Sequence, residues 1–208
     1  MHTEDEFQFL LIRHGYSLGN RLSTLSGQSN VPLLEKGRKE LERLSQERLY
    51  PVCDRNYSSD MDRCVDTFNT LYAGRATLDG TSSSLREINF GKFENLPQGG
   101  GNLQHFFSNW LADKRLADEE SFIQIAQRMS DFLTSSLREL HEDGLHSLCF
   151  VSHSVASRVL LVTLGAFERS QFSQIHMDNG QGYALRLSFD GHAAVLREIK
   201  PLPFARRM

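Results

Sequence analysis

The chain has 208 residues, 39% of them hydrophobic and 24% charged, a composition typical of a folded globular protein. Its 23 basic and 26 acidic residues give a net charge of −3, which argues against nucleic acid or an anionic membrane as a partner. No apolar stretch approaches the ~20 residues that cross a bilayer, and the N-terminal sequence MHTEDEFQF lacks the features of a signal peptide. Three cysteines without Cys-x-x-Cys spacing favour a reducing compartment, so we expect a cytoplasmic protein with no disulfide or metal site.

The first predicted element is a strand over residues 7–12, a nearly continuous apolar run that indicates burial on both faces. After a loop rich in glycine, serine and asparagine, the leucine spacing in PLLEKGRKELERLSQERL predicts a helix. The segment SSDMDRCVDTFNTLYAG predicts a second helix, with Ser59 or Asp60 as its N-cap and Gly74 at its end.

Further helices are predicted over residues 103–111 and 122–140, the second with one apolar stripe and with Asp118 to Glu120 at its positive end. A buried strand over 148–151 leads through a short loop into an apolar helix that ends at Gly165.

The C-terminal part predicts a hairpin, with strands over 183–189 and 193–199 on either side of Asp190-Gly191. Strands that alternate with helices before a closing hairpin predict an α/β three-layer sandwich, a mostly parallel mixed sheet flanked by helices. We find no internal repeat and no linker, so we expect a single domain over residues 1–208.

Two histidines stand in similar surroundings, 139 positions apart in the chain. The segments FLLIRHGYS and LCFVSHSVAS each consist of a buried strand, a histidine at its end and then small residues. Ligands of open α/β sheets bind beyond the carboxyl ends of the strands, where the turn into a helix also presents backbone N–H groups to anions. We therefore expect His14 and His153 to share one crevice that binds an anion.

Five motifs in order give the chain a resemblance to the histidine phosphatase superfamily, the phosphoglycerate-mutase-like proteins. They are RHG with an asparagine six residues after the histidine, SGQSNVPLLEKGRKEL, YSSDMDRCVDT, LREINFGKFEN and VSHSVASRVLL. Together they extend from residue 7 to residue 162. The motif residues that carry the family's chemistry are Arg13, His14, Asn20, Arg63, Glu87 and His153.

The resemblance implies a phosphoglycerate-mutase-like fold and a metal-independent phosphomonoesterase, a phosphoric monoester hydrolase of the histidine acid phosphatase type that needs no cofactor. His14 would attack the phosphorus of a small phosphorylated substrate and become a phosphohistidine, which divides one displacement into two. Glu87 would protonate the leaving oxygen and then deprotonate the attacking water.

The same resemblance places the phosphate among several donors. Arg13 and Arg63 would present planar guanidinium groups to its oxygens, and Asn20 would add an amide N–H. His153, in its protonated form, would supply a further donor. Arg158, in the apolar helix that follows, is expected to pair internally and to organise the site without touching substrate.

Some positions differ from the family pattern. Ser154 stands where glycine usually follows the second histidine, so it lies among the phosphate-binding candidates and adds bulk there; Tyr16 replaces the usual acidic residue or glutamine. Mutases of the family typically carry tryptophan where this chain has Gly19, and Arg-His-Tyr-Gly where Glu87 is followed by Ile-Asn-Phe-Gly. A phosphatase is thus favoured; a phosphosugar mutase, a phosphoprotein phosphatase and a non-catalytic phosphate-binding protein remain alternatives. The sequence indicates neither the physiological substrate nor the oligomeric state.

Overall fold

The computed structural model describes residues 5–114 and 118–203. They contain a six-stranded sheet with the strand order β3-β2-β4-β1-β5-β6. The strands are β1 (Asp5–Arg13), β2 (Arg55–Ser59), β3 (Gly80–Ser82), β4 (Ser147–Ser152), β5 (Gly182–Phe189) and β6 (Ala194–Leu202). The first four strands are parallel to one another, whereas β5 is antiparallel to β1 and β6 is antiparallel to β5. The predicted α/β fold with a mostly parallel mixed sheet is confirmed.

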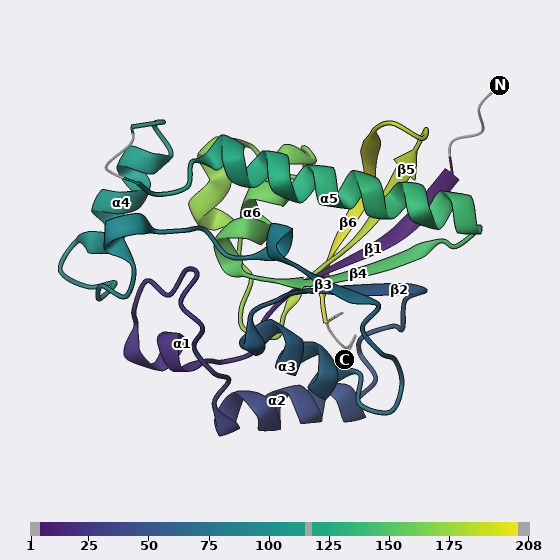
Figure 1. Cartoon of the computed structure of the whole chain (residues 1–208), viewed down its shortest axis with the longest axis horizontal. Coiled ribbons are helices and arrows are strands. Elements are labelled where there is room, and N and C mark those ends of the chain that lie inside the picture. The colour runs from purple at the N-terminus through teal and green to yellow at the C-terminus, as the bar shows by residue number, and fades with distance from the viewer. Residues whose placement is uncertain (1–4, 115–117, 204–208) are drawn as a thin grey trace.

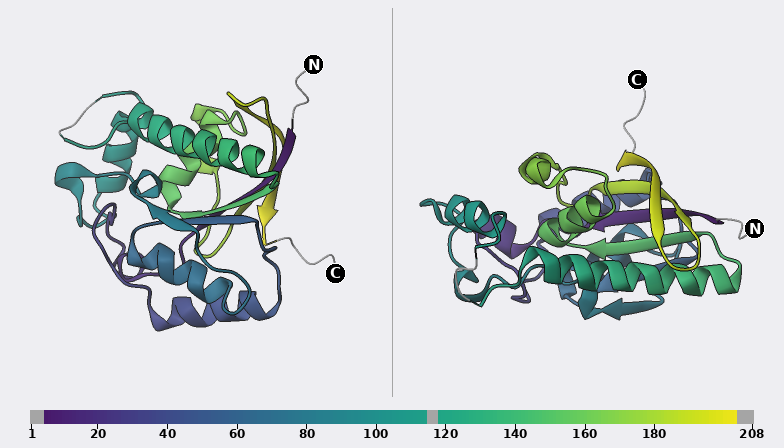
Figure 2. Two further views of the ribbon diagram at one scale, coloured as in Figure 1. Left: turned by 45° about the vertical axis from the view of Figure 1, so that its right-hand side comes forward. Right: turned by 90° about the horizontal axis from the view of Figure 1, so that it is seen from above.

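Helices cover both faces of this sheet (Figures 1 and 2). The α-helices are α1 (Leu18–Leu22), α2 (Glu35–Gln46), α3 (Asp62–Leu71), α4 (Asn102–Trp110), α5 (Phe122–Asp143) and α6 (Ser154–Thr163). Three short 3₁₀ helices are η1 (Ser83–Leu85), η2 (Gly91–Phe93) and η3 (Arg169–Gln174). Figure 1 shows α5 and α6 on one face and α2 and α3 on the other, with α1 and α4 beyond one end of the sheet.

The central strand β1 explains the three layers. Its residues Phe7, Phe9 and Leu11 join the apolar core beneath α5 and α6, whereas Leu10 and Ile12 join the core beneath α2 and α3. Successive side chains of a strand point to opposite faces, so a strand covered on both sides needs apolar residues at every position. Each such side chain contributes about 1.5–3 kcal/mol when it is fully buried.

The start of α3 differs from the prediction. The N-cap is Met61, and neither Ser59 nor Asp60 caps the helix. Ser59 is the last residue of β2, and both carboxylate oxygens of Asp60 accept hydrogen bonds from Arg86, at 2.7 and 2.6 Å. The helix also ends at Leu71, before the predicted Gly74. Tertiary contacts therefore recruited the side chains that local pattern had assigned to capping.

The strands β2 and β3 were not predicted from the sequence. The five residues of β2, RNYSS, are mostly polar, and β3 has only three residues, so neither shows the apolar pattern of a buried strand. β2 pairs with β4, and β3 pairs with β2, so each is placed by a neighbouring strand of the sheet.

Two ends of predicted elements are refined by side-chain hydrogen bonds. Ser121 caps α5, with Gln124 completing a capping box. The hairpin turn is longer than the predicted Asp190-Gly191: β5 ends at Phe189 and β6 begins at Ala194, and Oδ1 of Asp190 accepts hydrogen bonds from the backbone of His192 and Ala193. Among the described residues, no helix combines the length and apolarity that crossing a membrane requires.

Candidate active site

Two adjacent parallel strands bring the two predicted histidines together. In the register of β1 and β4, Arg13 lies opposite Ser152, so His14 and His153 leave the sheet side by side. The backbone N–H of His14 donates to the carbonyl of Ser152 at 3.0 Å, and the two imidazole centroids are 5.2 Å apart. A sequence separation of 139 positions is closed because both strands end at the same edge of the sheet.

A pocket of about 280 Å³ opens at this edge. Six of the seven predicted site residues line it: Arg13, His14, Asn20, Arg63, Glu87 and Ser154. His153 does not, because its side chain is fully buried behind that of His14.

The ring of His14 is held in one tautomer. Its Nδ1 lies 2.7 Å from the carbonyl oxygen of Gly15, so Nδ1 carries the hydrogen and Nε2 keeps its lone pair. Nε2 has no hydrogen-bond partner among the described residues. Burial, together with the positive charges of Arg63 and Arg13, holds the pKa of His14 well below the ordinary histidine value, so the ring is neutral.

Neighbouring side chains fix the loop that carries His14. The amide of Asn179 donates to the carbonyl of His14 and to Oδ1 of Asn20, both at 3.0 Å. The backbone N–H of Gly15 donates to the hydroxyl of Thr67 at 2.8 Å. Sequence analysis missed Asn179 and Thr67, because only the fold brings a turn residue and a helix residue to this loop.

His153 makes different contacts from those expected. Nε of Arg63 donates to its Nδ1 at 3.3 Å, so the hydrogen lies on Nε2, which faces the hydroxyl of Ser59 at 2.9 Å. Burial, followed by the charge of Arg63, lowers the pKa of His153 well below its ordinary value. The expectation of a protonated His153 is therefore wrong for this structure, in which the ring is a neutral acceptor for Arg63.

Arg63 is only 1% exposed, and its guanidinium is mostly engaged by the protein itself. Besides its bond to His153, it donates to three backbone carbonyls of the loop 26–29 at 2.8, 3.4 and 2.6 Å. Four of its five N–H groups are thus used, and one on Nη1 remains. The predicted fork for two phosphate oxygens is therefore not free.

The other two arginines of the pocket have unused donors. Arg13 donates from Nη1 to the carbonyl of Met177 at 2.7 Å, but its Nε has no partner among the described residues. Arg158 has neither a hydrogen bond nor an ion pair in the described part of the chain; its guanidinium lies 5.9 Å from the ring centroid of Phe172. The expected internal pairing of Arg158 is wrong. Burial lowers the pKa of both arginines, although not enough to deprotonate a guanidinium.

Glu87 lies against the first turn of α6. Its Oε1 accepts hydrogen bonds from the backbone N–H groups of Ile88 and Ala156, at 3.1 and 2.9 Å. Its Oε2 accepts one, from Val155 at 3.0 Å. Each carboxylate oxygen has two acceptor positions, so Oε2 is the atom with one still open.

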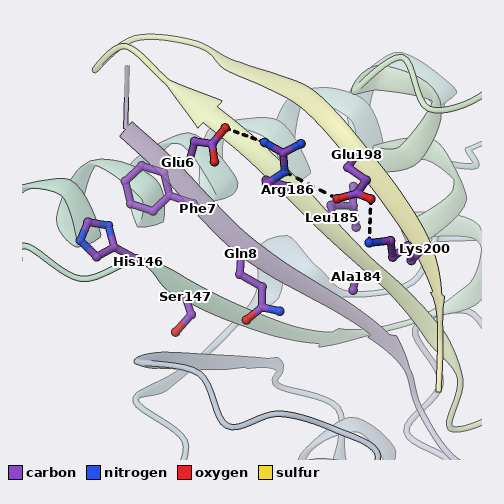
Figure 3. Close-up of a pocket in the computed structure, with 10 residues that line it drawn as sticks. All are labelled: Glu6, Phe7, Gln8, His146, Ser147, Ala184, Leu185, Arg186, Glu198 and Lys200. Atoms are coloured by element: carbon purple, nitrogen blue, oxygen red, sulfur yellow. Dashed lines mark hydrogen bonds and ion pairs between the residues drawn. The ribbon is translucent and has the colours of Figure 1, made fainter. Parts of the chain in front are cut away.

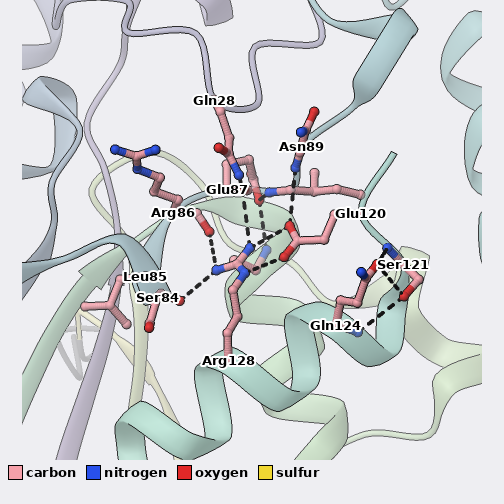
Figure 4. A network of polar contacts seen from close by, with 12 residues as sticks. Gln28, Ser84, Leu85, Arg86, Glu87, Asn89, Glu120, Ser121, Gln124 and Arg128 are labelled. Atoms are coloured by element: carbon pink, nitrogen blue, oxygen red, sulfur yellow. Dashed lines mark hydrogen bonds and ion pairs between the residues drawn. The ribbon is translucent and has the colours of Figure 1, made fainter. Parts of the chain in front are cut away.

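A largely buried ion pair supports the backbone that carries Glu87 (Figure 4). Arg128 on α5 pairs with Glu120 through bonds of 2.6 and 2.9 Å, and donates to the carbonyls of Ser84, Arg86 and Glu87 at 2.7, 2.7 and 3.3 Å. The two charged side chains are only 18% and 14% exposed. Sequence analysis missed Arg128, since nothing in the pattern of α5 distinguishes it from a surface arginine.

The outer wall of the pocket comes from two segments that pair by backbone hydrogen bonds. Leu25 donates to Leu96 and accepts from Asn95, both at 2.9 Å. Gln98 and the α4 residues Leu103 and Phe107 complete the wall. Of these residues, Leu25, Gln98, Leu103 and Phe107 line the pocket.

A second concavity lies at the opposite end of β1 (Figure 3). Its charged groups neutralise one another: Arg186 pairs with Glu6 at 2.6 Å and with Glu198 at 3.6 Å, and Lys200 pairs with Glu198 at 2.7 Å. This surface therefore offers no unpaired cation comparable with those of the His14 pocket. Over the ranges 5–114 and 118–203, no cluster of three His, Cys, Asp or Glu side chains is arranged to hold a metal ion.

The fold and this geometry define a class of α/β proteins in which neighbouring parallel strands each end in a histidine beside an arginine-lined pocket. The model of the histidine phosphatase superfamily, branch 1, matches residues 9–200, and the chain belongs to that family.

The chain is similar in sequence to a probable mutase and in fold to phosphatases. The chain is 30% identical over 162 residues to a probable phosphoglycerate mutase, GpmB, of Yersinia pestis strain Pestoides F, covering 76% of this chain and 74% of the relative. A mycobacterial glucosyl-3-phosphoglycerate phosphatase has the same fold, with a TM-score of 0.79 and 19% identity over 97% of this chain and 100% of the other. A phosphoserine phosphatase mutant of Entamoeba histolytica, in complex with phosphoserine, gives 0.72 and 20% over 93% and 96%.

The buried histidines give a prediction that needs no substrate. Because burial and nearby arginines lower both pKa values, we expect His14 and His153 to remain neutral well below pH 6.5, the ordinary histidine pKa. Imidazole chemical shifts followed by NMR from pH 8 to 5 test this, with the exposed His192 as the reference signal. Titration of both buried rings near pH 6.5 would contradict the geometry described above.

The Arg128–Glu120 pair gives a prediction of stability. Removing one partner of a largely buried pair leaves an uncompensated charge, so Arg128→Met should lower the free energy of unfolding by an amount below the ~3–5 kcal/mol of a fully buried pair. The double variant Arg128→Met/Glu120→Leu should lose less than the sum of the two single variants, by about 0.5–3 kcal/mol. Urea denaturation of the four proteins measures this coupling; additive losses would show that the pair does not act as a unit.

Proposed function

We propose that this protein is a metal-independent phosphomonoesterase that works through a phosphohistidine at His14. The observation that carries the proposal is the state of that ring: Nδ1–H is fixed on the carbonyl of Gly15, and the unprotonated Nε2 lies in a pocket lined by arginines. A neutral imidazole beside cationic donors is the combination that in-line attack on a phosphate dianion requires.

The phosphate is held by donors that the protein leaves unused. Nε of Arg13 has no partner among the described residues, and Arg63 retains one N–H on Nη1. Oδ1 of Asn20 accepts from the backbone N–H of Ser17 at 3.0 Å, so its amide nitrogen is the part available to an oxyanion. Ser154, at the start of α6, adds a hydroxyl and the positive end of a helix. The positive charge of Arg13 and Arg63 compensates the negative charge spread over the equatorial oxygens of the transferred phosphate.

The two half-reactions balance around Glu87. In the first, His14 Nε2 forms a bond to phosphorus, the phosphorus–oxygen bond of the ester breaks, and a proton on Oε2 of Glu87 passes to the leaving alkoxide. In the second, Glu87 takes a proton from water, the water oxygen attacks phosphorus, and the bond to Nε2 breaks. Inorganic phosphate and the alcohol are the products, and Glu87 is again protonated for the next turnover.

His153 acts as a positioning residue in this proposal. It packs behind His14 and accepts a hydrogen bond from Arg63, so its neutral ring sets the orientation of the group that faces the phosphate. This revises the direct contact that the family resemblance implied.

A phosphosugar mutase is the second candidate, favoured by the relative named as a probable phosphoglycerate mutase. The two activities share phosphorylation of His14 and differ in the acceptor, which is water for the phosphatase and a second hydroxyl for the mutase. Product analysis separates them: inorganic phosphate supports hydrolysis, and an isomeric phosphoester supports transfer. A phosphoprotein substrate is less well supported, because the pocket holds only about 280 Å³ and is walled by residues of α4.

Replacing the nucleophile should abolish turnover. In His14→Ala the arginines still bind phosphate but no atom can form the covalent intermediate, so we expect kcat to fall at least ~10³-fold, a loss of about 4 kcal/mol of transition-state stabilisation. His192→Ala, which removes an exposed imidazole, is the matched control. After a reaction with phosphate-labelled substrate is quenched, acid-labile and base-stable label on the wild-type protein supports the phosphohistidine intermediate. A His14→Ala protein that kept more than one part in a thousand of the wild-type kcat would exclude it.

The role of Glu87 can be tested through the leaving group. An alkyl phosphate releases a basic alkoxide that needs a proton, whereas p-nitrophenyl phosphate releases a stable anion. Glu87→Gln should therefore slow phosphoenzyme formation ~10²–10⁴-fold for an alkyl phosphate and much less for the aryl ester. Single-turnover measurements isolate this step.

Two comparisons make the Glu87 result interpretable. Glu142→Gln changes an exposed carboxylate on α5 and should affect neither substrate. Equal losses on both esters in Glu87→Gln would mean that the carboxylate only orders the start of α6. Glu94 is a poor alternative for the role of general acid, because its carboxylate already accepts hydrogen bonds from Ser29 and from the backbone of Phe90.

A further inference from the structure

Arg158 is an unpaired cation at the boundary between two cavities. It lines the His14 pocket together with Ser154, which lies one helical turn earlier on the same face of α6. It also lines an adjacent cavity of about 440 Å³, whose walls are largely apolar. The two cavities share Leu103 and Phe107 of α4 as well as Arg158.

The absence of a partner is unusual for this side chain. Nε of Arg158 is buried without a hydrogen bond, and no described carboxylate forms an ion pair with the group. A charged group that is partly withdrawn from water is normally compensated by an ion pair or hydrogen bonds, because desolvation costs several kcal/mol. The contact with Phe172 orients the guanidinium but leaves its N–H donors unused.

Arg158 stands between the site of the transferred phosphate and the apolar cavity, because it lines both the His14 pocket and that cavity. That phosphate is expected at Nε2 of His14, at the N-terminal end of α6, whereas Arg158 lies a turn further along the helix, next to the apolar cavity. The rest of a substrate that extends from the phosphate toward this cavity would pass the guanidinium.

We propose that Arg158 forms a second anion subsite, which binds a carboxylate or similar anionic group on the alcohol part of the substrate. The apolar part of the same alcohol lies against Leu103 and Phe107, where the two cavities meet. The inference rests on the proposed phosphatase function and specifies its substrate class: phosphomonoesters whose leaving group carries both a negative charge and an apolar body.

A binding experiment tests this subsite without turnover. The ligands are 3-carboxyphenyl phosphate and its methyl ester, which share the phosphate and the ring but differ in the second charge. Isothermal titration on the His14→Ala protein should give a Kd at least ~10-fold lower for the carboxylate, the gain expected from a charge-assisted hydrogen bond. Adding Arg158→Met should remove this difference, and Arg158→Lys should retain part of it.

Controls separate a subsite from general damage. Arg158→Met keeps an apolar stem against Phe172, and its thermal melting curve shows whether the protein remains folded. Arg169→Met removes another ring-stacked guanidinium, 4.4 Å from the centroid of Phe122 and outside both cavities, and should leave the ratio of the two Kd values unchanged.

The remaining outcomes each decide the question. Equal affinity for the two ligands in the Arg158-containing protein overturns the subsite. If Arg158→Met weakens binding of inorganic phosphate as much as that of 3-carboxyphenyl phosphate, Arg158 serves the transferred phosphate and the proposal is also overturned. Release of phosphate from the methyl ester by the wild-type protein is measured separately, so failure of the phosphatase proposal is seen independently of the subsite.

Discussion

The site depends on one buried guanidinium. Arg63 projects from α3 and connects three segments that are distant in sequence: its own helix, the loop 26–29 and the start of α6 at His153. A charge that is 1% exposed is tolerated only when its donors are satisfied, and here backbone carbonyls and an imidazole satisfy four of them. The loop 26–29 packs closely against the backbone of Ile88 because Gly27 has no side chain. A Cβ at residue 27 would collide with the carbonyl oxygen of Ile88.

The same charge adds to the effect of burial in keeping both histidines neutral. Arg63 lowers the pKa of His14 and of His153, in each case after burial as the larger cause. Both rings therefore remain neutral, and each has a hydrogen bond that selects its tautomer. The result is a pocket whose cations are all arginines, which cannot lose their protons, and whose candidate nucleophile retains its lone pair. Such a pocket favours an anionic ligand.

The hydrogen-bond partners of the arginines differ from those that their motifs predict. Arg63, which the motif assigns to the phosphate, donates most of its N–H groups to acceptors of the protein itself. Arg158 makes no ion pair or hydrogen bond with described residues. The difference follows from geometry: the loop 26–29 folds over α3 and presents carbonyls to Arg63, while the side of α6 that carries Arg158 faces α4 and η3 across two cavities. Supporting groups such as Arg128 and Asn179 hold the site from outside it, in the manner expected of preorganised sites.

The sequence by itself determined the parts that depend on local pattern and on ordered motifs. The apolar runs before His14 and His153 predicted strands covered on both faces, and the periodicity of α2, α3 and α5 predicted helices, so the α/β class followed. The motifs also selected seven site residues, six of which line one pocket. Short polar strands such as β2, the cap at Met61, the partners of Arg63, the lack of a hydrogen bond between Arg158 and described residues, and the charge state of His153 were decided only by tertiary structure. The physical reason is that hydrogen-bond partners and desolvation depend on which distant segments pack together, and a one-dimensional pattern records neither.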